Sequence, residues 1–202
     1  MHFIPKDHTV HLCVDMQRLF AENTEWQTPW AHKILPQVLA LTELAPEQTV
    51  FTRFIPAEKS GQGHGMWKKY YEHWNCMTLE KLDRSLVELI PELMKFVPPA
   101  EVIDKPVYGP WIVTDLHQRL QKRGINTLIV SGGEIDICVL ATVLGAVDSG
   151  YRVIVASDAV CCSDDKSYDS IMNLFKQRFS RQRGGGNCKN SFQLVLANHN
   201  HP

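Results

Sequence analysis

Three residues whose side chains could hydrolyse an amide each follow an apolar stretch of the sequence. They are Asp15 after the run 9–14, Lys105 after the run 101–103, and Cys138 after the run 126–130 and two glycines. A carboxylate can accept a proton, an ammonium can hold a neighbouring negative charge, and a thiol can attack a carbonyl carbon. Cys138 is expected at the start of a helix, where the helix dipole favours thiolate and should lower the thiol pKa.

Strand-like and helix-like segments alternate along the chain. The apolar patterns predict strands over 9–14, 49–54, 101–103, 126–130, 151–156 and 192–196, and helices over 31–44, 112–123, 137–149 and 165–179. Such alternation is typical of an α/β fold with three layers, α/β/α, around a mainly parallel sheet, here of about six strands. Because ligands bind beyond the carboxyl ends of parallel strands, Asp15, Lys105 and Cys138 are expected to share one edge.

The region 55–78 is the longest interruption of this alternation, and it is rich in aromatic residues. It contains Trp67, Tyr70, Tyr71 and Trp74. An insertion after a strand end often shapes a ligand pocket, but it could equally be a surface cover that packs its own rings. We expect the insertion to belong to one domain that spans residues 1–202.

Composition and charge narrow the class of protein. The chain has 202 residues, 44% hydrophobic and 21% charged, with a net charge of -1. These values predict a single globular domain with no nucleic-acid partner. No apolar run approaches the ~20 residues of a membrane span, and the N-terminus does not have the pattern of a secretory signal. The six cysteines form no C-x-x-C pair, which favours a reducing, cytoplasmic setting.

Short motifs in a particular order give a family resemblance. They are Val14-Asp15-Met16-Gln17 with Phe20, Lys105 with Tyr108, Gly132 to Val139, Ala141-Thr142, Gly150-Tyr151, and Ser157-Asp158-Ala159. Over about residues 9–180 the chain resembles the isochorismatase-like cysteine hydrolases. That superfamily includes nicotinamidases, N-carbamoylsarcosine amidases and biuret hydrolases.

The resemblance implies a catalytic triad of Asp15, Lys105 and Cys138. Asp15 would accept the thiol proton, Lys105 would hold Asp15, and Cys138 would attack the substrate. A cis peptide bond is implied at Gly133–Glu134, with the backbone N–H groups of Glu134 and Cys138 forming an oxyanion hole. The resemblance further implies a small-molecule substrate, no cofactor, and a homodimer or homotetramer.

The sequence departs from the metal-binding nicotinamidases. Those relatives carry an Asp-x-His motif and a further histidine after the second strand, and neither follows Phe54 here. His64 and His73 have no carboxylate at ligand spacing, so we predict no catalytic metal. Glu134 occupies a position that is usually small or apolar in relatives. Its side chain either points away from the pocket or reads a cationic or amide group of the substrate.

Five further residues are candidates for substrate binding. They are Phe20, Arg53, Trp67, Tyr108 and Trp111. The aromatic residues could instead be ordinary packing residues, and Arg53 could bind a substrate carboxylate or be ion-paired.

The sequence therefore predicts a metal-independent cysteine amidohydrolase that cleaves a C–N bond of a small amide, ureide or carbamoyl compound through a covalent intermediate on Cys138. Vinyl-ether hydrolysis, as in isochorismatases proper, is an alternative, although it needs no thiol. A non-catalytic binding or scaffold member is a second alternative. A redox-responsive thiol protein is a third, with Cys161 and Cys162 as possible partners of Cys138.

Overall fold

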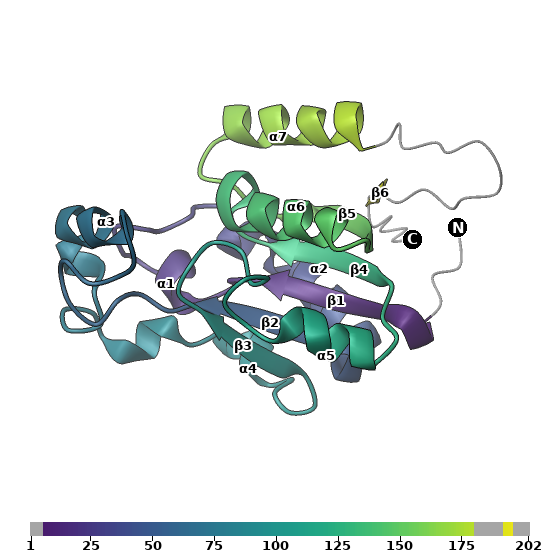
Figure 1. The fold of residues 1–202 in the computed structure, drawn as a ribbon, viewed down its shortest axis with the longest axis horizontal. Coiled ribbons are helices and arrows are strands. Elements are labelled where there is room, and N and C mark those ends of the chain that lie inside the picture. Colours follow the sequence, from purple (N-terminus) through teal and green to yellow (C-terminus); the bar gives the residue numbers. More distant parts are fainter. Residues whose placement is uncertain (1–5, 180–191, 196–202) are drawn as a thin grey trace.

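A parallel sheet of six strands lies at the centre of the computed structural model, which describes residues 6–179 and 192–195. Its strands are β1 (Thr9–Val14), β2 (Thr49–Phe54), β3 (Glu101–Lys105), β4 (Thr127–Gly132), β5 (Arg152–Val160) and β6 (Phe192–Val195). They lie side by side in the order β3-β2-β1-β4-β5-β6, and each adjacent pair is parallel. All the strands therefore end at the same edge of the sheet (Figure 1).

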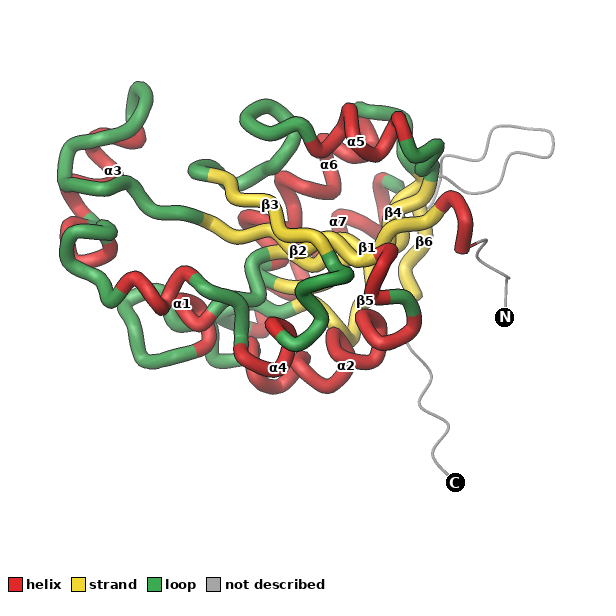
Figure 2. Tube along the Cα trace, turned by 90° about the horizontal axis from the view of Figure 1, so that it is seen from below, coloured by secondary structure: helices red, strands yellow, loops and turns green. Residues whose placement is uncertain are grey.

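Helices cover both faces of the sheet, as Figures 1 and 2 show. The helices are α1 (Arg18–Ala21), α2 (Ala31–Leu44), α3 (Trp67–His73), α4 (Pro91–Met94), α5 (Leu116–Lys122), α6 (Leu140–Asp148) and α7 (Asp165–Arg178). One apolar core joins the sheet to α5, α6 and α7, and the other joins it to α1, α2 and α4. No helix in residues 6–179 is long and apolar enough to cross a membrane.

The central strand β1 is buried over its whole length, which explains its nearly continuous apolar sequence. Leu12 and Val14 lie in the core under α5 and α6, and Cys13 lies in the core under α2. A parallel strand covered on both faces has no solvent side, so both sets of alternating side chains must be buried.

The predicted alternation and the three-layer class are confirmed, but the predicted helix over 112–123 is wrong at its start. The helix α5 begins at Leu116, and Ile112 and Val113 are 96% and 44% exposed. The cause is Trp111, whose indole Nε1 donates to Thr142 O at 2.8 Å. This contact holds the loop that contains Trp111 against α6. Ile112 and Val113 therefore stay in the loop, and α5 begins only after them.

A buried histidine at the centre of β1 predicts a loss of stability in acid. His11 Nε2 lies 2.7 Å from Ser131 Oγ, and burial lowers the His11 pKa from 6.5 to about 4. The unfolded chain therefore binds this proton first as the pH falls, and folding stability is lost between those two values. We expect urea unfolding to show a loss of up to about 3 kcal/mol from this group between pH 7 and pH 4.

The control separates His11 from the carboxylates that titrate in the same range. His11→Gln should show a flatter stability profile than the wild type over this pH interval. His8→Gln, at an exposed position, should keep the wild-type profile. An unchanged slope in His11→Gln would contradict the assignment.

Candidate active site

Asp15 and Lys105 form a buried ion pair across the end of the sheet. Lys105 Nζ lies 2.6 Å from Asp15 Oδ2, and their side chains are 0% and 1% exposed. Asp15 follows β1 and Lys105 ends β3, so the two chains reach each other across the intervening strand β2. Removal of one partner from such a pair would leave an uncompensated buried charge.

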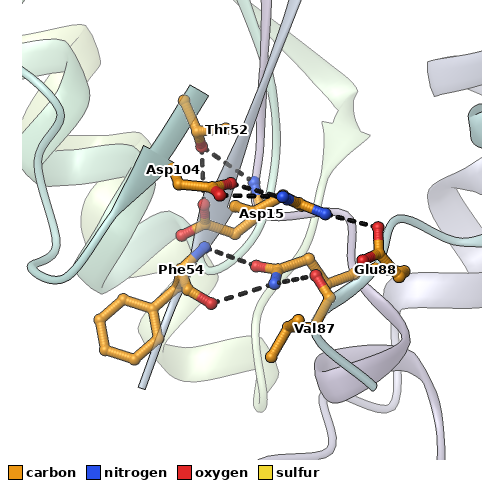
Figure 3. Close-up of polar contacts among 8 residues, drawn as sticks. Asp15, Thr52, Phe54, Val87, Glu88 and Asp104 are labelled. Carbon is orange, nitrogen blue, oxygen red and sulfur yellow. Dashed lines mark hydrogen bonds and ion pairs between the residues drawn. The ribbon is translucent and has the colours of Figure 1, made fainter. Parts of the chain in front are cut away.

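The strand β2 supplies a third group that holds the carboxylate. Thr52 Oγ1 donates to Asp15 Oδ1 at 2.6 Å and accepts from Asp15 N at 3.2 Å (Figure 3). Lys105 Nζ also donates to Val107 O at 3.2 Å and lies 5.4 Å from the centre of the Phe54 ring. Both charged groups are therefore fixed by partners on several strands.

The chain after β4 turns through two glycines that have no space for a side chain. A Cβ at Gly132 would lie 2.0 Å from Val14 O, and Gly132 has a φ of 102°. A Cβ at Gly133 would lie 2.5 Å from Cys161 Sγ. The Gly133–Glu134 peptide bond is cis, at the position that the family resemblance implies. A π-helical turn over Ile135–Val139 then leads into α6 and carries Cys138.

Burial and the neighbouring Asp15 carboxylate both favour the protonated form of the Cys138 thiol. Burial raises the pKa of Cys138 well above its ordinary value, and the Asp15 carboxylate raises it further. Lys105 lowers this pKa, but by less than Asp15 raises it. The expectation that the helix dipole makes this thiol acidic is therefore wrong, because desolvation and a neighbouring negative charge are the larger effects.

A pocket of about 310 Å³ opens beside Cys138. Six of its thirteen lining residues are aromatic, and the remainder include polar residues. The lining residues are Phe20, Glu25, Trp26, Gln27, Phe54, Tyr70, Trp74, Tyr108, Gly133, Glu134, Ile137, Cys138 and Ser163. This volume suits a small molecule.

The structure places some of the predicted binding residues in this pocket and others elsewhere. Phe20 and Tyr108 line the pocket, and Trp67 packs behind Tyr108 with ring centroids 4.9 Å apart. Trp111 instead stacks on Tyr151 at 5.7 Å, away from the pocket lining. Its indole N–H pairs with a carbonyl of α6, so Trp111 has the packing role that the sequence left open beside substrate binding.

Arg53 has the second of its two predicted roles, that of an ion-paired residue. Its guanidinium pairs with Asp104 at 2.7 Å and with Glu88 at 2.5 Å, and it does not line the pocket (Figure 3). Alternation along β2 explains this result: Thr52 and Phe54 share the face that carries the site, and the residue between them points to the other face.

Several pocket residues were missed by sequence reasoning. Trp26 is central, since its ring lies 5.8 Å from Phe54 and 6.0 Å from Trp74. It belongs to the segment after β1, and its position after a strand end was the available signal. Tyr70 and Trp74 were not missed in the same way, because they belong to the 55–78 insertion, which has the first of its two predicted roles and contributes to the pocket wall.

A buried amide positions one of these walls. Gln17 Nε2 donates to Phe54 O at 3.0 Å and to Val87 O at 2.7 Å, and Phe54 N donates to Gln17 Oε1 at 2.7 Å. Figure 3 shows Phe54 and Val87 on either side of these contacts. Two of these hydrogen bonds hold the backbone of Phe54 at the end of β2, and the third ties it through Gln17 to Val87. Over residues 6–179, no three His, Cys, Asp or Glu side chains gather in a group suited to a metal ion.

Comparison with known proteins defines the family. Residues 9–183 match the model of the isochorismatase domain, so the chain belongs to the isochorismatase family, and we class it as a hydrolase. It is 29% identical over 169 residues to nicotinamidase 3 of Arabidopsis thaliana, covering 81% of this chain and 78% of the relative. A probable inactive nicotinamidase of the same plant is 26% identical over 160 residues, covering 77% and 82%.

Solved structures agree on the fold. A cysteine hydrolase from Pseudomonas syringae pv. phaseolicola 1448A superposes with a TM-score of 0.77 at 22% identity. The superposition covers 96% of this chain and 90% of that one. The three-layer arrangement around a parallel sheet is therefore the fold of that hydrolase.

Proposed function

We propose that the protein is a metal-independent cysteine amidohydrolase that cleaves a C–N bond of a small amide, ureide or carbamoyl compound. The observation that carries this proposal is the meeting of three side chains at one pocket: Asp15 accepts hydrogen bonds from Lys105 and Thr52, and Cys138, whose pKa both Asp15 and Lys105 affect, lines the pocket. A nucleophile that hydrogen-bonds to a base, which is itself oriented by further groups, is the arrangement needed for covalent catalysis.

The first half of the reaction forms a covalent intermediate. Asp15 takes the proton from Cys138, and the sulfur forms a bond to the carbonyl carbon of the substrate. The carbonyl π electrons move to oxygen, and the backbone N–H groups of Glu134 and Cys138 hold this oxyanion. Collapse of the tetrahedral species breaks the C–N bond, and the leaving nitrogen takes the proton from Asp15.

The second half returns the enzyme to its starting state. Asp15 takes a proton from water, and the oxygen of that water attacks the thioester or thiocarbamate carbon. The C–S bond then breaks and the sulfur recovers the proton. Lys105 keeps its proton throughout and compensates the negative charge that moves between Asp15 and Cys138. The raised pKa of Cys138 fits this order, in which the thiolate forms only when substrate is bound.

Two alternatives are less well supported by the site. Vinyl-ether hydrolysis, as in isochorismatases proper, needs no thiol nucleophile, so it would give Cys138 no catalytic role beside Asp15. A non-catalytic member should have lost one of the three side chains or their contacts, and Asp15, Lys105 and Cys138 are all in place. We further propose a homo-oligomer, which light scattering would test.

A screen for ammonia release over small amides, ureides and carbamoyl compounds tests the proposed activity. We expect at least one compound to release ammonia at a rate that dialysis against a chelator leaves unchanged. Acid quenching during turnover should leave the acyl or carbamoyl group on the peptide that contains Cys138, as read by mass spectrometry. Ammonia release that the chelator abolishes, or an adduct on another residue, would contradict the proposal.

A further inference from the structure

The pocket beside Cys138 has walls that suit a positive charge. Aromatic rings present a negative face, and a cation within about 6 Å of a ring centre is attracted to it. The Trp26 ring packs edge-to-face with the Phe54 and Trp74 rings, at 72° and 71°, and all three residues line the pocket. Phe20 and Tyr108 extend the same wall.

Two carboxylates add to this preference. Glu134 and Glu25 both line the pocket, the first half-buried and the second exposed at the mouth. The Ser163 hydroxyl donates to Glu134, which fixes the direction of that carboxylate. Burial raises the pKa of Glu134, so its ionised form lacks solvation that a bound cation would supply.

Positive side chains do not offset these carboxylates. Among the described residues that line the pocket, none is lysine, arginine or histidine. The Lys105 ammonium is fully buried and paired with Asp15, and Arg53 is paired with Asp104 and Glu88. A substrate carboxylate would therefore find two like charges and no partner, which is unfavourable for binding.

We propose that the substrate carries an ammonium or guanidinium group, which lies between the aromatic rings and the carboxylates of Glu25 and Glu134 while its amide carbon lies at Cys138. This inference rests on the proposed function, because it takes Cys138 as the reacting atom. It narrows the substrate class to small cationic amides, ureides or carbamoyl compounds. The cavity volume of about 310 Å³ accommodates such a molecule.

Thiol labelling with reagents of opposite charge tests the pocket without knowledge of the substrate. The cationic 2-(trimethylammonium)ethyl methanethiosulfonate and the anionic 2-sulfonatoethyl reagent each transfer an alkylthio group to the thiolate. The S–SO2 bond breaks, a disulfide forms, and methanesulfinate is released. Their rates at Cys138, read by peptide mass spectrometry, are divided by their rates with 2-mercaptoethanol. We expect the normalised ratio to favour the cation by about tenfold or more, from cation–π and charge terms together.

Variants that remove a charge show which residues cause the preference of Cys138 labelling for the cationic reagent. Glu134→Gln and Glu25→Gln should each lower it, whereas Glu47→Gln should not. Glu47 is a matched control because it is exposed and lies before β2, at the other edge of the sheet. A changed thiol pKa cancels in the ratio, since both reagents meet the same thiolate. A wild-type ratio near one, or a preference for the anion, would overturn the cation proposal.

Turnover of charge-matched amides gives a second readout and separates the two proposals. Trimethylammonioacetamide and 3,3-dimethylbutanamide have the same shape but differ in charge, and succinamate is the anionic comparison. We expect the cationic amide to have the highest kcat/KM. If turnover depends on Cys138 but kcat/KM is not highest for the cationic amide, the cation proposal is contradicted and the proposed hydrolase activity is not. Failure of both thiosulfonates to label Cys138 even above its raised pKa, where thiolate forms, would defeat both proposals, because the thiol would not be open to the pocket.

Discussion

Replacing Cys138 by serine should lower kcat for amide hydrolysis by about 10⁴-fold or more, because the group that forms the covalent bond is lost. The Cys138 side chain is 7% exposed, and serine is close to it in shape. The fold should therefore persist, with a small change in thermal unfolding. Steady-state ammonia release and circular dichroism measure the two quantities on the same preparation.

The matched control for this variant is another cysteine. Cys76 is exposed and does not line the pocket, so Cys76→Ser should keep wild-type turnover. Turnover that survives in Cys138→Ser, or that is lost equally in Cys76→Ser, would show that the sulfur of Cys138 is not the nucleophile.

Asp15→Asn should separate the reactivity of the thiol from the activity of the enzyme. Turnover should fall by about 10²- to 10⁴-fold, because the base that receives the thiol proton is removed. The Cys138 pKa should fall at the same time, since Asp15 raises it by more than Lys105 lowers it. Iodoacetamide should therefore alkylate Cys138 faster at neutral pH in this variant than in the wild type, and the two readouts should move in opposite directions.

The pH dependence of labelling shows whether the Asp15 carboxylate raises or lowers the pKa of Cys138. In the wild type, the labelling rate should keep rising above the ordinary thiol pKa, because the folded pKa is raised. In Asp15→Asn the rise should occur at lower pH. Asp104→Asn is the control, since Asp104 is exposed, precedes Lys105 on β3 and pairs with Arg53. Slower labelling in Asp15→Asn would mean that the carboxylate does not disfavour thiolate.

The chain positions of the candidate site could be predicted because they depend on local sequence. An apolar run predicts a buried strand, and parallel strands bring their carboxyl ends to one edge. Asp15, Lys105 and the turn before Cys138 follow from that rule, and their meeting requires only the order of the strands. The order itself puts β1 and β3 on either side of β2, where Thr52 completes the set of contacts.

The chemistry of the thiol could not be predicted in the same way. The pKa of Cys138 is decided by burial and by Asp15, which lies far away in the sequence. The start of a helix can be predicted from neighbouring residues in the sequence, but the charged groups that the fold brings close to it cannot. Trp26 and Trp111 show the same limit, because aromatic residues in loops carry no periodic signal that separates a pocket wall from a packing contact.

Gly132 and the pocket segments lead to a consequence for how this scaffold could be altered. With no room for even a methyl group between Gly132 and Val14, the turn that leads to Cys138 and the strand before Asp15 form one closely packed unit. Trp26, Tyr70 and Trp74 belong to excursions of the chain outside that unit. Selectivity and reactivity are therefore separable. Replacing those loops by loops of other sequence should change which compounds bind, while Asp15, Lys105 and Cys138 keep their arrangement.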